Sequence, residues 1–185
     1  MTLTLEDLLE VLRQQVPDLW RNWQSVIDRE DSPLSLACRR GLVLACALTQ
    51  REPSLLGVLL QTGEEWLSHE TRLDAKNAAS LMAMNNVFYR FRHEVPHPGY
   101  TTSSARLRMT RLLQPEGKKI DVELWATALS TLNGCGACTR AHEDKARQLG
   151  ATEEQVLEAI RIAAVVAGIS VALSDLAVDL PAVRS

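Results

Sequence analysis

The residues best suited to chemistry in this chain are two cysteines and a histidine, in the segment Cys135-Gly-Ala-Cys138 followed by His142. On a helix that begins near Cys135, these residues fall at positions i, i+3 and i+7, which places two thiols and an imidazole along one face. Two cysteines one turn apart can form a disulfide, so one sulfur can attack a substrate while the other resolves the product. The imidazole can exchange a proton with the thiol four residues before it. The motif therefore predicts a redox-active dithiol.

The residue pattern leaves two questions about this motif open. Cys135 lies in the first helical turn, where the helix dipole lowers a thiol pKa, whereas Cys138 has the histidine one turn away, and an imidazolium has the same effect. A zinc site with Glu123 as a further ligand is an alternative, although the second Cys-x-x-Cys or histidine pair typical of structural zinc is missing. Spacing alone does not bring Glu123 to the thiols, and taken by itself it is typical of a solvated helix residue.

Helical periodicity with capping signals recurs along the chain, and strand signals are almost absent. Capping boxes are expected at Thr4 with Asp7 and at Thr152 with Gln155. Prolines and a glycine predict a loop at 93–100. Helices are expected after Thr4, after a cap at Asp18, over about 33–49 with Ser32 as its cap, 53–67, 74–91, 104–113, 121–132 and 135–149, and from Thr152 onward. Because no strand precedes the dithiol, the thioredoxin setting is excluded, and we predict one all-α domain over 1–185.

Composition favours a globular cytoplasmic protein. A net charge of −3 and the lack of a basic stripe argue against nucleic-acid binding. The N-terminus has no basic region typical of a secretory signal. The longest apolar run, 162–173, is shorter than the roughly 20 residues of a membrane span and predicts a buried helix. Cys38 and Cys46 lie in an apolar helix, so we expect them to be buried and unreactive.

A weak internal repeat is visible when the chain is shifted by 81 positions. This shift pairs Ala45, Ala47 and Leu48 with Ala126, Ala128 and Leu129. It predicts a duplicated helical unit with pseudo-repeat halves at about 1–100 and 101–185, of which only the second keeps the chemistry.

Glu123, Cys135, Cys138 and His142, within the segment 123–143, closely resemble the motif of AhpD-type alkylhydroperoxidases of the carboxymuconolactone decarboxylase-like superfamily. The likeness extends to 84–91 and 107–109. The resemblance implies an all-helical, internally duplicated fold in homotrimers or larger oligomers. It also implies reduction of organic hydroperoxides with electrons from a dihydrolipoyl group on a lipoyl-bearing protein, support of an AhpC-type peroxiredoxin, and no bound cofactor.

By position, the resemblance makes Cys138 the peroxidatic thiolate and Cys135 the resolving thiol, with Glu123 and His142 as a proton relay. Ala137 stands where some relatives carry a histidine, so a second imidazole in the relay is not expected here.

Two other functions are compatible with the scaffold. One is non-redox lactone decarboxylation, for which a Cys-x-x-Cys has no use, and the other is a dithiol sensor or disulfide reductase.

Overall fold

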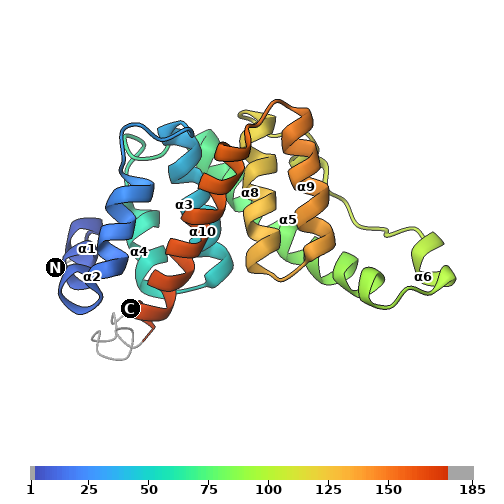
Figure 1. Ribbon diagram of the computed structural model, residues 1–185, viewed down its shortest axis with the longest axis horizontal. Helices are drawn as coiled ribbons and strands as arrows, with labels where there is room; N and C mark the ends of the chain where they lie inside the picture. Colours follow the sequence, from blue (N-terminus) through green and yellow to red (C-terminus); the bar gives the residue numbers. More distant parts are fainter. Residues whose placement is uncertain (1–2, 175–185) are drawn as a thin grey trace.

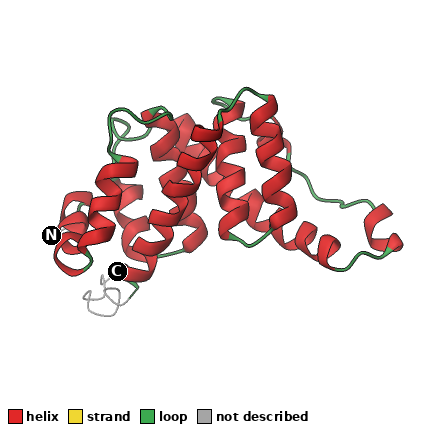
Figure 2. Cartoon of the chain, viewed as in Figure 1, coloured by secondary structure: helices red, strands yellow, loops and turns green. Residues whose placement is uncertain are grey.

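The computed structural model describes residues 3–174, and within this range the chain forms helices and no strand, which confirms the all-α prediction (Figures 1 and 2). The elements are α1 (Leu5–Gln15), α2 (Pro17–Asn22), the π-helix η1 (Trp23–Ile27), α3 (Leu36–Gln50), α4 (Pro53–Gln61), α5 (His69–Glu94), α6 (Pro98–Thr102), α7 (Thr110–Leu113), α8 (Lys119–Leu132), α9 (Gly136–Gln148) and α10 (Glu153–Leu173).

Local capping chemistry explains where most of these helices begin. The capping boxes of Thr4 and Thr152 are both formed, as predicted. The predicted cap at Asp18 is wrong, because Pro17 occupies the first turn of α2 and Asp18 follows it. The predicted cap at Ser32 is also wrong, since Ser35 accepts the hydrogen bond from the Cys38 N–H that starts α3.

The segments around α5 differ most from the expectation. Helix α5 begins one turn earlier than predicted and continues to Glu94, so it includes the first two residues of the expected loop. Pro98 then starts the short helix α6, because a proline at the first helical position loses no intrahelical bond. The helix predicted over 104–113 is reduced to α7, and α4 ends at Gln61 rather than near residue 67.

The core forms where α3, α5, α8 and α10 pack against one another, with α9 against α8. Trp125 on α8 is buried and donates its indole N–H to the carbonyl of Cys38 on α3, at 3.0 Å. The two helices approach closely at Gly41, where a Cβ would overlap the Trp125 ring. This contact fixes α8, and with it the base of the dithiol turn.

Helix α10 is long and apolar enough to span a membrane by length and composition alone. In this fold it packs against α3 and α8, and more than half of its most apolar stretch is buried. The apolar run at 162–173 therefore contributes to the core, as predicted.

The helix order around the core shows a regular spacing. Helices α3, α4 and α5 begin at residues 36, 53 and 69, and α8, α9 and α10 begin 83, 83 and 84 residues later. The offset of 81 found in the sequence differs from this spacing by two to three residues. Internal duplication of a helical unit stays a prediction.

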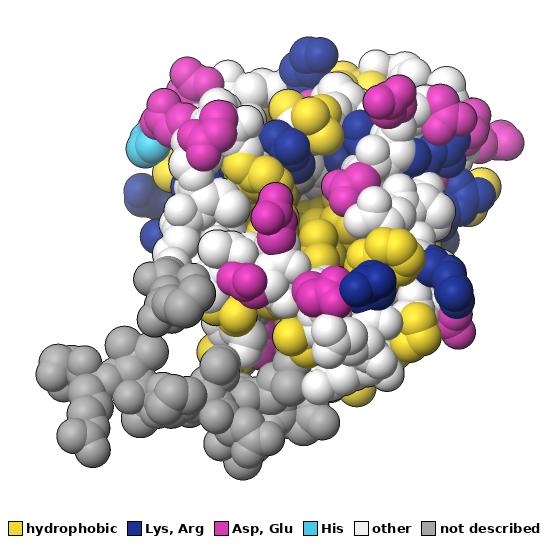
Figure 3. Space-filling model, turned by 90° about the vertical axis from the view of Figure 1, so that its left-hand side faces the viewer, with side chains coloured by type: hydrophobic (Ala, Val, Ile, Leu, Met, Phe, Trp, Pro, Cys, Tyr) yellow, Lys and Arg dark blue, Asp and Glu magenta, His cyan; other side chains and the backbone are white. Residues whose placement is uncertain are grey.

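The end of the molecule that carries the N-terminal helices has a mixed surface. Figure 3 shows acidic and basic side chains interspersed around hydrophobic ones on this face. At the opposite end, the last turns of α5 and helix α6 project away from the helical body (Figure 1).

Candidate active site

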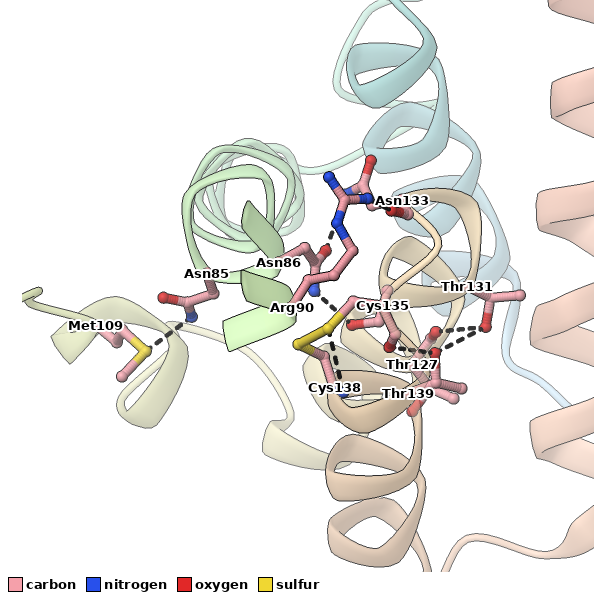
Figure 4. Close-up of a disulfide and its surroundings, with 11 residues drawn as sticks. Asn85, Asn86, Arg90, Met109, Thr127, Thr131, Asn133, Cys135, Cys138 and Thr139 are labelled. Carbon is pink, nitrogen blue, oxygen red and sulfur yellow. Dashed lines mark hydrogen bonds between the residues drawn. A yellow bond between two sulfur atoms is a disulfide. The ribbon is translucent and has the colours of Figure 1, made fainter. Parts of the chain in front are cut away.

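The dithiol lies at the turn between α8 and α9. Cys135 is the N-cap of α9, and Cys138 lies in its first turn. Their sulfurs are joined in a disulfide, with 5.3 Å between the Cα atoms (Figure 4). Gly134 precedes them with φ of +68°, a left-handed conformation that favours glycine. The turn therefore presents both cysteines at the start of one helix.

The two sulfurs have different surroundings. Cys135 is 1% exposed, and its sulfur accepts a hydrogen bond from the Cys138 N–H at 3.4 Å. Cys138 is 7% exposed and lines a cavity of about 530 Å³. Cys135 is not among the residues that line this cavity. A small molecule in the cavity thus meets Cys138 first.

Glu123 is a buried carboxylate that lines the same cavity as Cys138 and contacts two basic side chains. Glu123 on α8 is 5% exposed, so the view of it as a solvated residue is wrong. One carboxylate oxygen is 2.7 Å from His142 Nδ1 and the other is 2.8 Å from Lys119 Nζ. Burial raises the pKa of Glu123, but the hydrogen bonds from His142 and Lys119 together outweigh burial and lower it below the ordinary value.

This geometry fixes the proton on one ring nitrogen of the imidazole. An ionised carboxylate only accepts hydrogen bonds, so His142 Nδ1 must carry the proton that it shares with Glu123. In the neutral ring, Nε2 is then left with a free lone pair. Because His142 also lines the cavity, it can act there as a proton acceptor.

Helix α5 supports the dithiol turn from behind through a buried amide. The Asn86 side chain donates to the Ser130 hydroxyl at 3.1 Å and accepts from the Asn133 amide at 2.9 Å (Figure 4). Arg90 adds a hydrogen bond to the Asn133 carbonyl at 2.7 Å. The backbone carbonyl of Ser130 accepts a hydrogen bond from the Cys135 N–H, at 2.9 Å. Sequence reasoning missed this network, although an Asn-Asn pair in the middle of a long helix is a usable signal.

The cavity wall is completed by α5, α7, α9 and the segment before α7. Its apolar members include Leu112 and Ala141, and Ala137 also faces it. His93, expected in a loop, belongs to α5 and lines the cavity together with Tyr89. The site can therefore admit an organic molecule with an apolar substituent to the Cys138 sulfur.

The other two cysteines are placed as expected. Cys38 and Cys46 are buried in α3, and burial raises the pKa of both thiols. Neither lines the cavity, so neither competes with the dithiol. Among residues 3–174, no three His, Cys, Asp or Glu side chains gather in a way that could hold a metal ion.

Known proteins are similar in sequence to this chain over most of its length. Residues 100–178 match the carboxymuconolactone decarboxylase family. The protein named alkyl hydroperoxide reductase AhpD from Methylobacterium sp. strain 4-46 is 42% identical over 173 residues, covering 94% of this chain and 97% of the relative. Proteins of the same name from Anaeromyxobacter dehalogenans and Streptomyces griseus are 43% and 40% identical, covering 91% and 95% of this chain and 90% and 98% of their own lengths. The chain therefore belongs to the AhpD family of the carboxymuconolactone decarboxylase superfamily.

Proposed function

We propose that this protein is an antioxidant peroxidase that reduces organic hydroperoxides through the Cys135–Cys138 pair. The observation that carries the proposal is the asymmetry of the pair, in which Cys138 opens on the cavity and Cys135 is enclosed behind it. The names of the relatives support the same activity. Cys138 is thus assigned as the peroxidatic thiolate and Cys135 as the resolving thiol.

The oxidative half of the cycle has two steps. With its Nε2 lone pair, His142 takes the proton of the Cys138 thiol, and Glu123 stabilises the imidazolium. The thiolate attacks the terminal peroxide oxygen, so an S–O bond forms, the O–O bond breaks, and the leaving alkoxide takes a proton from the imidazolium. Cys135 then condenses with the resulting sulfenic acid, which releases water and forms the disulfide.

The reductive half requires a dithiol donor. We propose a dihydrolipoyl group on a lipoyl-bearing protein, because its two thiols can first form a mixed disulfide and then close their own ring. The attack falls on Cys138, which the cavity exposes, and Cys135 leaves as thiolate. Once reduced, the Cys135–Cys138 pair passes electrons in the same way to an AhpC-type peroxiredoxin. This cycle needs a reducing compartment, for which we propose the cytoplasm.

Assembly into a homotrimer or larger oligomer is part of the proposal. The last turn of α5 and helix α6, at the projecting end of the molecule (Figure 1), carry the exposed apolar side chains Phe91 and Tyr100. Phe91 and Tyr100 pack together, with ring centres 5.4 Å apart. Such a cluster on an extension suits burial against a second copy. Light scattering coupled to size-exclusion chromatography measures the subunit number, and a monomer at micromolar concentration would contradict this part.

The activity is tested by turnover of tert-butyl hydroperoxide with dihydrolipoamide, thioredoxin or glutathione as reductant. We expect many turnovers per dithiol with dihydrolipoamide, and none in a Cys138→Ser variant. Cys46→Ala, which removes a buried thiol outside the cavity, serves as the matched control and should keep the wild-type rate. Oxidation that stops after one equivalent of peroxide with every donor would instead identify a sensor.

A further inference from the structure

A second buried amide on α5 faces the cavity instead of the dithiol turn. Asn85 lines the same cavity as Cys138 and is 3% exposed. Its Oδ1 atom is buried without a hydrogen-bond partner, and its Nδ2 atom donates to the sulfur of Met109 at 2.7 Å. Figure 4 shows that Asn85 points to Met109 while its neighbour Asn86 points toward the dithiol turn.

This arrangement is unusual for a buried side chain. Nearly all buried polar atoms in native proteins have a hydrogen-bond partner, and a thioether is only a weak acceptor. Asn86 next to it satisfies both ends of its amide with Ser130 and Asn133. Among the described residues, three other buried side-chain atoms lack a partner, and none of them belongs to a residue that lines this cavity. The Asn85 amide therefore has both an unpartnered acceptor and a weakly bonded donor at the cavity that Cys138 also lines.

We infer that Asn85 binds the hydroperoxide group of the substrate. A hydroperoxide R–O–O–H carries one donor and two acceptor oxygens, which complements a carboxamide. Its O–H donates to Asn85 Oδ1, and Asn85 Nδ2 donates to the oxygen that bears the R group. This inference rests on the proposed peroxidase function and names a substrate-binding residue for it.

The same contacts assist the reaction. When the Cys138 thiolate attacks the terminal oxygen, negative charge develops on the oxygen that bears R, where Asn85 Nδ2 donates. The terminal oxygen keeps its hydrogen and becomes the sulfenic acid. The alkoxide leaves and takes its proton from the His142 imidazolium. The atoms and charges balance without a further reactant.

The Met109 sulfur is the group that a substrate must replace at this amide. Met109 precedes α7, is partly exposed and ends in a flexible thioether, which can rotate away at little cost. A bound hydroperoxide replaces the weak N–H···S bond with an N–H···O bond and gives the unpartnered oxygen a donor. The site is thus selective for peroxides with a free O–H group.

The test compares two reagents on reduced protein, each under single-turnover conditions. One is tert-butyl hydroperoxide, and the other is methyl methanethiosulfonate, which modifies the same thiol but has no O–H or N–H group. In the Asn85→Leu variant, we expect the ratio of the hydroperoxide rate constant to the thiosulfonate rate constant to fall about tenfold, as for loss of one to two buried hydrogen bonds. Ser54→Ala, which removes an unpartnered buried hydroxyl outside the cavity, should leave the ratio unchanged.

An unchanged ratio in Asn85→Leu would overturn the inference, whereas a wild-type protein that does not react with hydroperoxide would overturn the proposed function itself. A second measurement uses the wild-type protein and so does not depend on whether the variant folds. In the wild type, 2-phenylpropan-2-ol should protect Cys138 from methyl methanethiosulfonate at a several-fold lower concentration than its methyl ether, which lacks the O–H. Equal protection by the alcohol and the ether would contradict binding through Asn85.

Discussion

Replacement of Glu123 by glutamine tests the proton relay, because it preserves size but changes one acceptor oxygen to an NH₂ group. The carboxylate uses both oxygens, one for Lys119 and one for His142. An ammonium can only donate, so the glutamine oxygen must face Lys119, and its NH₂ must face His142 Nδ1. The ring then has to accept at Nδ1 and carry its proton on Nε2. In that tautomer, His142 has no lone pair for the Cys138 thiol.

The structure separates the effect on rate from the effect on stability. Loss of a positioned general base lowers rates by about 10²–10⁴-fold. The fold loses a charge-assisted hydrogen bond and regains a neutral one, which costs about 1–2 kcal/mol. A protein of ordinary stability, roughly 5–15 kcal/mol, remains folded after such a change. We therefore expect an inactive variant with a native fold.

The assay combines steady-state turnover of tert-butyl hydroperoxide with ¹⁵N NMR of the histidine ring. Glu123→Gln should lose at least about 100-fold in kcat and show the proton on Nε2. Glu143→Gln is the matched control, since Glu143 is partly exposed on α9, does not line the cavity, and pairs with Arg147 at 3.9 Å. A variant within threefold (roughly 0.6 kcal/mol) of the wild-type kcat, or an unchanged tautomer, would refute the relay.

Three further outcomes follow from the site. Cys135→Ser should accumulate a sulfenic acid on Cys138 that dimedone labels, and label confined to the Cys138→Ser variant would reverse the two roles. Asn86→Leu leaves the buried Ser130 hydroxyl and the partly exposed Asn133 side-chain amide without this partner and should lower the free energy of unfolding by about 1–3 kcal/mol, measured by urea denaturation. The lowered pKa of Glu123 means that its ion pairs stabilise the fold above the ordinary value of 4.5 and lose that effect as the pH falls through the lowered value. The difference in urea midpoint between wild type and Glu123→Gln should therefore shrink below pH 4.5, and a difference that grows there would contradict this assignment.

The parts of the site that lie on one helix could be predicted from the sequence. The positions of Cys135, Cys138 and His142 on one face follow from helical periodicity, which depends only on the local chain. The capping boxes at Thr4 and Thr152 are local in the same sense.

The parts that depend on packing between helices could not be predicted in this way. Glu123 meets His142 because α8 and α9 pack side by side, although 19 residues separate the two in sequence. The pairing of Asn86 with Ser130 spans 44 residues. The expectation of a helix over 104–113 fails as well, since only α7 of that segment is helical, and Met109, Leu112 and Leu113 line the cavity. Residue spacing contains no information about such contacts between separate elements.

The two opposing arguments about thiol acidity describe different steps of the proposed cycle. Cys135 caps α9, and its sulfur accepts a backbone N–H, so a negative charge on it is stabilised. It does not line the cavity, however, and a stable thiolate there cannot reach a peroxide. A stabilised thiolate is a good leaving group in disulfide exchange. In the proposed cycle, the helix N-terminus therefore favours release of the Cys135 thiolate when a donor thiol attacks Cys138. His142 acts in the other half-reaction, where it removes the proton from the Cys138 thiol before the attack on the peroxide. Each half-reaction is thus assisted by a different feature of the fold.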